Sequence, residues 1–252
     1  MSDQSISGLS IFCWNIGNPS RQRAALQAEW LRTRPEDILV LTETKNSEGC
    51  VLLQRYFEAY GYHVVFPLPE GKEYGVMIVS KHRLVPSDLP VKIETLAARV
   101  ATAKLEGEYG LRLMGVYVPS RDASVDKISR KRQFLKNLNA TMERSGAFHH
   151  TILCGDLNIL EPAHVPHYPF FEQWEYDFYS GLEKLAFRDA FRVCHPNDRA
   201  YSWVGRTGDG YRYDHCFLSG DLVEQLDDCG YVDEPRKTKL SDHSGMRLTF
   251  RA

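Results

Sequence analysis

The chain has 252 residues, of which 43% are hydrophobic and 25% charged, and its formal net charge is −2. A chain of this size and composition folds around a sizeable core and needs neither disulfides nor a structural metal to do so. The chain therefore lacks the net positive charge of many nucleic-acid-binding proteins. Any contact with phosphates depends on local basic patches or on a bound cation.

Nine short apolar runs predict strands, because they are rich in β-branched and aromatic residues and are bounded by Gly, Pro, Asp or Asn. In chain order they span residues 9–14, 38–42, 62–66, 75–80, 99–105, 111–118, 151–154, 213–218 and 246–250. Amphipathic patterns predict helices at 21–33, 51–60, 126–144 and 170–185. Several neighbouring strands have no helix between them, which favours two packed sheets covered by helices over a βαβ repeat. No linker interrupts the pattern, so we expect one domain over residues 1–252.

The six cysteines, at positions 13, 50, 154, 194, 216 and 229, form no Cys-x-x-Cys pair that would indicate a zinc or redox motif. Cys13, Cys154 and Cys216 lie within apolar runs, and we interpret them as small buried hydrophobic residues. This usage fits a reducing compartment. Residues 1–8 lack the features of a signal peptide, and no apolar stretch is long enough to cross a membrane. We therefore expect a cytoplasmic protein.

Polar side chains are concentrated where the apolar runs begin or end. They are Asn15, Glu43, Tyr117, Asp156, Asn158, Asp214, Asp242 and His243. Each acid alone is more often a turn former or a helix cap. Together, four acids, two asparagines and a histidine make a set rich in oxygen ligands, which suits a hard cation such as Mg²⁺ or Mn²⁺. Asp156 and Asn158 are two residues apart, so both would face the same way if that segment is extended.

Short motifs containing these residues follow one another along nearly the whole chain. They are Trp14-Asn15, Glu43-Thr-Lys45, Gly75-Val-Met-Ile-Val-Ser80, Val116-Tyr-Val-Pro119, Gly155-Asp-Leu-Asn158, Phe187-Arg-Asp-Ala-Phe-Arg192, Tyr201-Ser-Trp203, Arg212-Tyr-Asp214 and Ser241-Asp-His243. The series resembles the endonuclease/exonuclease/phosphatase superfamily, and within it exonuclease III and the abasic-site endonucleases. The resemblance implies a four-layer α/β sandwich, in which helices flank two packed mixed β-sheets as in deoxyribonuclease-like folds. It also implies a metal-dependent phosphodiesterase.

The resemblance further implies a role for each polar residue. Glu43 would be the principal metal ligand, with Asn15 beside it and Asp242 as a further ligand or a support. Asp156 would orient or deprotonate the attacking water. Asn158 and Tyr117 would hold phosphate oxygens, while His243, oriented by Asp214, would donate to the phosphoryl oxygen.

Other residues are candidates for substrate contact. Trp203 could stack on a base or a sugar, although a core position is equally compatible with the sequence. Arg121, Arg212 and Lys239 are candidates for phosphate contact, and the basic run at 130–132 is either a further contact or an exposed helix face. The His164-x-x-His167 pair lacks a third ligand, so we expect exposed loop histidines there instead of a zinc site. His215 is interpreted as structural.

We therefore expect a monomeric, Mg²⁺- or Mn²⁺-dependent DNA nuclease with 3′-exonuclease or abasic-site endonuclease activity. One alternative is a phosphodiesterase or phosphatase that acts on RNA, nucleotides or a phosphorylated small molecule. A second alternative is an inactive nucleic-acid-binding homologue. The presence of all four acids and of His243 argues against it. The chain departs from the abasic-site enzymes at Thr42, where they usually have Gln, and at Ser120-Arg121, where they usually have Asn-Gly. The catalytic core is therefore matched better than abasic-site specificity.

Overall fold

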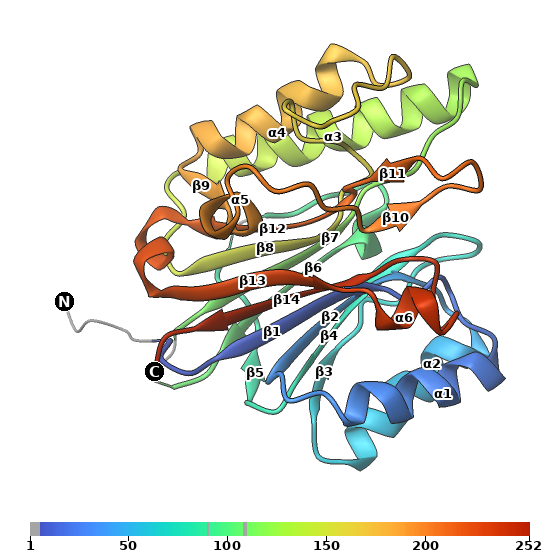
Figure 1. The fold of residues 1–252 in the computed structure, drawn as a ribbon. Coiled ribbons are helices and arrows are strands. Elements are labelled where there is room, and N and C mark those ends of the chain that lie inside the picture. The colour runs from blue at the N-terminus through green and yellow to red at the C-terminus, as the bar shows by residue number, and fades with distance from the viewer. Residues whose placement is uncertain (1–5, 90, 108–109) are drawn as a thin grey trace.

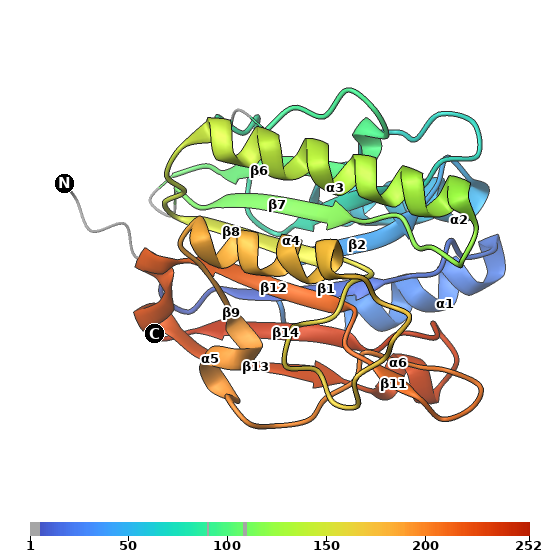
Figure 2. The same cartoon turned by 90° about the horizontal axis from the view of Figure 1, so that it is seen from above.

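The computed structural model describes residues 6–89, 91–107 and 110–252 and has four layers (Figures 1 and 2). Two six-stranded sheets pack face to face. Helices α1 (Arg21–Arg32) and α2 (Glu48–Ala59) cover the outer face of one sheet, and α3 (Val125–Ser145) and α4 (Gln173–Lys184) cover the outer face of the other. The predicted fold is thereby confirmed. Among the described residues, the structure has no helix with the length and apolar character needed to span a membrane.

The first sheet has the strand order β13-β14-β1-β2-β4-β3. Its strands are β1 (Ser10–Asn15), β2 (Ile38–Thr44), β3 (His63–Val65), β4 (Gly75–Ser80), β13 (Leu226–Val232) and β14 (Gly245–Phe250). Strands β1 and β2 are parallel, and the other pairs in this sheet are antiparallel. The sheet is therefore mixed, as predicted.

The second sheet has the order β5-β6-β7-β8-β12-β9. Its strands are β5 (Leu84–Val85), β6 (Val100–Leu105), β7 (Arg112–Tyr117), β8 (Thr151–Asp156), β9 (Phe187–Asp189) and β12 (Asp214–Ser219). Here β7 and β8 form the parallel pair. Outside the two sheets, β10 (Trp203–Val204) pairs with β11 (Gly210–Tyr211). The short helices α5 (Ala190–Cys194) and α6 (Glu234–Lys237) and the 3₁₀ turns Ala97–Arg99 and Gly220–Gln225 complete the chain.

All nine predicted strands and all four predicted helices are present, whereas strands β5, β9, β10, β11 and β13 were not predicted. Four of these have only two or three residues and carry no readable alternation. Strand β13 has seven residues, but Asp227, Asp228 and Gly230 interrupt its apolar character. It lies at the edge of its sheet, where charged residues are compatible with a strand and discourage pairing with another chain.

The topology brings the predicted polar residues to one edge of the sandwich. The two parallel pairs, β1–β2 and β7–β8, end at this edge, and their last residues include Asn15, Tyr117 and Asp156. Strand β12 runs the opposite way and begins there with Asp214, which is directly opposite Asp156 in the sheet register. Strand β14 also begins there, just after His243. Strand ends from both sheets therefore supply a single site.

Candidate active site

Glu43 is directed into the site by a β-bulge in β2. The pairing of β2 with β4 places Thr42 opposite Val76 and Thr44 opposite Gly75, so Glu43 is an extra residue between them. Its φ of 56° lies in the left-handed region, which is uncommon for a residue with a side chain. Bulges of this kind change the direction of a side chain and occur often beside active sites. The local strain is therefore consistent with a functional position.

Asn15 connects the acidic residues of the two sheets. Its Nδ2 donates to Glu43 Oε2 at 3.0 Å and to Asp156 Oδ2 at 2.8 Å. Its Oδ1 accepts from Gly17 N at 2.9 Å, which fixes the amide in this orientation. In this structure Asn15 therefore presents donors to the carboxylates, and its oxygen faces the backbone.

Asp156 is almost completely buried and is held on both of its oxygens. Asn158 N donates to Oδ1 at 2.9 Å, and Asn15 Nδ2 donates to Oδ2. Burial and the nearby charge of Asp214 raise the pKa of Asp156 to about 7, although His243 and these hydrogen bonds oppose the shift.

Asn158 has a φ of 49°, and its Nδ2 donates to Val118 O at 2.9 Å. An amide nitrogen carries two hydrogens, so one N–H of Asn158 remains available.

His243 forms a buried pair with Asp214. Its Nδ1 lies 2.8 Å from Asp214 Oδ2. Burial alone would lower the pKa of His243, but the charge of Asp214 and this hydrogen bond outweigh it and raise the pKa to about 10. The imidazole is therefore a cation at neutral pH. Because Nδ1 is bound to Asp214, Nε2 carries the proton that faces the rest of the site.

The Tyr201-Ser-Trp203 motif holds this pair in place. Ser202 Oγ accepts from the backbone nitrogens of Tyr213 and Asp214, at 3.0 and 3.1 Å. Trp203 forms an isolated β-bridge with His243. On the other side of the site, Trp14 Nε1 donates to His243 O at 3.2 Å. Main-chain contacts therefore fix both partners in advance of substrate binding.

These residues open onto a cavity of about 310 Å³. Its polar lining comes from Glu43, Ser120, Arg121, Lys131, Asp156, Asn158 and His243, and its aromatic lining comes from Tyr74, Tyr117, Phe170, Phe171, Trp203 and Tyr213. Burial and the charges of Glu43 and Asp156 raise the pKa of Tyr117 well above its usual value, so its hydroxyl stays protonated and can donate. The cavity thus combines charged groups, neutral donors and flat apolar rings.

Comparison with known proteins decides which family the chain represents. The model of the endonuclease/exonuclease/phosphatase family matches residues 12–243. The chain belongs to this family. It is 27% identical to an exodeoxyribonuclease of Bacillus subtilis over 95% of this chain and 98% of that protein.

Two solved structures support the same assignment. An AP endonuclease from Archaeoglobus fulgidus superimposes with a TM-score of 0.83 and 27% identity, covering 97% of this chain and all of the other. A 3′ phosphatase from Neisseria, solved with a product DNA hairpin, superimposes with a TM-score of 0.78 and 26% identity over the same shares. As a member of the family, the chain is a hydrolase of phosphate esters.

Metal binding is typical of the endonuclease/exonuclease/phosphatase family, and the acidic residues of this chain fit a hard divalent cation. Carboxylate oxygens of Asp156 and Asp214 come within 4.8 Å of each other, and Asn15 connects Asp156 to Glu43. Asp214 Oδ1 is buried and has no hydrogen-bond partner. Two buried carboxylates at this spacing repel each other, which contributes to the raised pKa of Asp156. A divalent cation would relieve that repulsion, and carboxylate oxygens are the ligands it prefers.

Three of the predicted substrate residues differ in their access to the cavity. Trp203 lines it, and its Nε1 donates to Asp242 Oδ2 at 2.9 Å. Arg121 also lines the cavity, although only 3% of its side chain is exposed and it is paired with Glu175. Arg212 is fully buried, with its Nη2 2.7 Å from both Glu161 Oε2 and Asp189 Oδ2. The prediction that Arg212 contacts substrate is therefore wrong, because its charge is used within the core.

Lys239 is exposed on the loop before Ser241 and lies outside the cavity lining, so its contact with a phosphate stays a prediction. Two other predictions are corrected. Lys131, which belongs to the basic run at 130–132, does not lie on an exposed helix face. Its ammonium is buried against Glu175 and Asn158 O, and the side chain forms part of the cavity wall. His164 was predicted to be exposed, but only 7% of it is exposed, and its Nε2 lies 3.2 Å from Gly210 O. His215 is buried beside Asp189, in keeping with its structural interpretation.

The sequence-based reasoning missed several residues that line the cavity. Tyr74 directly precedes β4, and Tyr213 directly precedes Asp214, so adjacency to predicted strand ends could have indicated both. Phe170 and Phe171 reach the cavity from the long loop before α4. No sequence pattern distinguishes these two from the other aromatic residues of that loop.

Proposed function

We propose that this chain is a Mg²⁺- or Mn²⁺-dependent DNA nuclease of the 3′-exonuclease or abasic-site endonuclease type. The observation that carries the proposal is a single cavity lined by aromatic rings, by a cationic His243 and by the carboxylate of Asp156. The pKa of Asp156 is raised to about 7. A phosphodiester is an anion with flat bases attached to it. The cavity offers complementary groups for both parts.

Asp156 is proposed to accept the proton of the attacking water. A general base is most effective when its pKa lies near the working pH, and the pKa of Asp156 is raised to about 7. Hydrogen bonds from Asn158 N and Asn15 Nδ2 fix the direction of the carboxylate. Holding the base in one orientation lowers the entropic cost of reaching the transition state.

His243, Asn158 and Tyr117 are proposed to donate to the phosphoryl oxygens. The Nε2–H of His243 carries positive charge because Asp214 stabilises the imidazolium. The remaining N–H of Asn158 and the protonated hydroxyl of Tyr117 add neutral donors from another side of the cavity. Such donors stabilise the negative charge that develops during hydrolysis.

Glu43 is proposed as the principal ligand of the metal ion, and the carboxylate of Asp156, which Asn15 links to Glu43, adds negative charge nearby. When bound, the ion neutralises substrate charge and stabilises the leaving oxygen. Asn15 is proposed to hold Glu43 and Asp156 together through its amide hydrogens. For Asp242 the bond from Trp203 Nε1 favours support of that side chain over direct ligation.

DNA is proposed as the substrate because the similar proteins are described as an exodeoxyribonuclease, an AP endonuclease and an enzyme bound to a DNA hairpin. The description of the last as a 3′ phosphatase makes removal of 3′ phosphates from DNA a second candidate. We further propose that the chain is one catalytic domain that acts as a monomer in the cytoplasm. The match over residues 12–243 supports the single domain, and the six free cysteines support a reducing compartment.

A panel of substrates tests the proposal. Duplex DNA with an abasic site, duplex DNA with a recessed 3′ end, a hairpin with a 3′ phosphate, RNA and a small aryl phosphate ester are each incubated with enzyme and Mg²⁺. We expect turnover of at least one DNA substrate and its loss in His243→Gln. The control His149→Gln changes an exposed histidine that does not line the cavity and should keep full activity. Turnover of the small ester alone would contradict the DNA assignment.

A further inference from the structure

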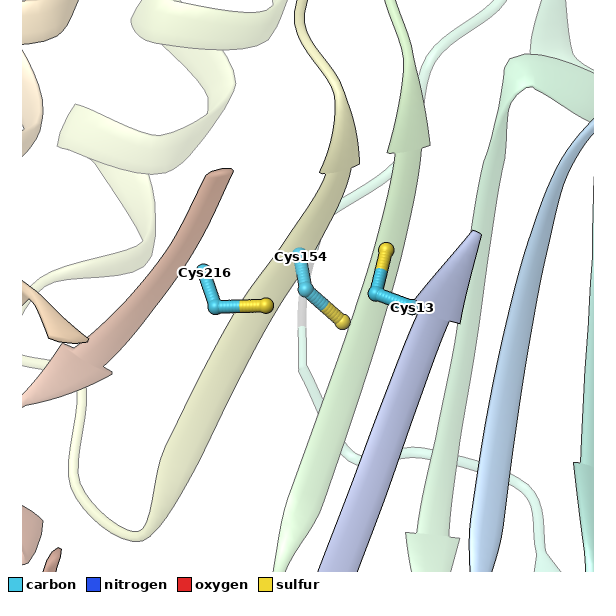
Figure 3. A group of neighbouring side chains, drawn as sticks. All are labelled: Cys13, Cys154 and Cys216. Carbon is cyan, nitrogen blue, oxygen red and sulfur yellow. The ribbon is translucent and has the colours of Figure 1, made fainter. Parts of the chain in front are cut away.

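Three thiols meet in the core between the two sheets (Figure 3). Cys13 comes from β1 of one sheet, and Cys154 and Cys216 come from β8 and β12 of the other. Each of their Sγ atoms lies within 4.8 Å of the other two. All three cysteines are free, and none is more than 1% exposed. The group brings together three potential sulfur ligands that are far apart in the sequence.

The thiols lie directly beneath the polar residues of the active site. Each is two residues away from one of them on the same strand: Cys13 from Asn15, Cys154 from Asp156, and Cys216 from Asp214. Side chains two residues apart in a strand point to the same face, so the sulfur atoms form the next layer inward. The register repeats this order, because Cys154 is opposite Cys216 as Asp156 is opposite Asp214.

The number and type of ligands select a particular kind of ion. Sulfur ligands prefer soft ions such as copper(I) or the borderline zinc ion. Structural zinc sites almost always have four ligands, whereas this group of described residues contains three. With metal–sulfur bonds of about 2.3 Å, three sulfurs around a planar three-coordinate ion are about 4 Å apart. The observed group approaches that spacing without any change of strand register.

Burial of the sulfurs restricts when an ion can bind. Cysteine ligates metals as the thiolate, so binding releases thiol protons, and water cannot reach these sulfurs in the folded chain. The presence of three sulfur ligands, without a fourth ligand in this group, favours a soft three-coordinate ion.

We propose that Cys13, Cys154 and Cys216 form a binding site for copper(I). Because the sulfurs are buried, the ion enters before the two sheets close on each other. The site is distinct from the cation site at the cavity, which has oxygen ligands and suits a hard divalent ion. The chain thus carries two sites of opposite ligand preference in adjacent layers.

The test measures copper retained by the full chain. Protein is refolded from urea without oxygen, in the presence of copper(I) buffered by a chelator, and is then dialysed against the same chelator. A second sample is loaded after folding. We expect about one copper per chain in the refolded sample and three sulfur neighbours at about 2.3 Å in its X-ray absorption spectrum. Less than about a tenth of an equivalent in both samples would overturn the proposal.

Variants separate this site from adventitious binding to thiols. Cys154→Ala and Cys216→Ala should each lose the bound copper, and circular dichroism checks that each variant folds. If one variant fails to fold, the other provides the same test. Cys229→Ala is the matched control, since Cys229 is equally buried on β13 but is not part of the group. Equal copper in all three variants would refute the assignment, and tight zinc binding without copper would refute the choice of ion.

Discussion

Replacing Asp156 with Asn should stabilise the metal-free protein while it abolishes activity. Burial and the charge of Asp214 raise the pKa of Asp156 from 3.8 to about 7. A raised pKa means that the folded state binds the proton more tightly than the unfolded state, so ionisation of this buried group costs stability. A neutral Asn side chain of the same shape avoids that cost. Its benefit is absent below about pH 4, grows between pH 4 and 7, and is constant above.

The magnitude follows from the same shift. A difference of about 3 pH units corresponds to about 4 kcal/mol at pH 8. Asn15 Nδ2 loses its carboxylate acceptor, which subtracts about 1 kcal/mol. The remaining gain of about 3 kcal/mol should raise the melting temperature by about 10 °C in a chain of this size.

Thermal and urea unfolding from pH 4 to 8.5, in the presence of a metal chelator, measure this effect. Asp189→Asn is the matched control, because Asp189 is also buried but its pKa is held well below the usual value. Burial opposes ionisation of Asp189, and the charge of Arg212 and a hydrogen bond from His215 outweigh it. That variant should be less stable than the wild type at pH 8. A stability gain in Asp156→Asn that does not change with pH, or no gain at all, would refute the electrostatic reasoning.

Three further predictions follow from other parts of the site. Activity should persist up to about pH 10, where His243 in the folded protein loses its proton. His243→Gln should lower the turnover number by about 10²–10³-fold. Rates measured from pH 6 to 10.5 for the wild type and this variant test both expectations. Mg²⁺ at about 100 times its dissociation constant should stabilise the wild type by about 2.7 kcal/mol but not Glu43→Gln, as measured by melting curves with and without chelator. Arg212→Met should cost about 3–5 kcal/mol in urea unfolding, because it leaves Asp189 buried without its guanidinium and Glu161 with Arg192 as its remaining cation. A loss below about 1 kcal/mol would contradict that role.

The sequence by itself determined the layers of this protein and the position of its site along the strands. The period of apolar residues identifies strands and helices locally, and it places Asn15, Glu43, Tyr117 and Asp156 at or near the ends of predicted strands. Their gathering in one site was implied by the resemblance to the family. Edge strand β13 escaped prediction because Asp227, Asp228 and Gly230 mask its pattern. Local composition carries little information about an edge strand that is partly exposed to solvent.

Only the tertiary structure decided which charges face the substrate and which stay inside. Arg212 is two residues from Asp214 and was predicted to contact substrate, but it meets Glu161 and Asp189, which lie 51 and 23 residues away along the chain. Lys131 belongs to a basic run, yet its ammonium is buried against Glu175. Asn15 joins Glu43 and Asp156 only because two separate sheets end side by side. Such pairings depend on contacts between distant segments, and a local pattern of residue types does not encode which distant partner a charge will find.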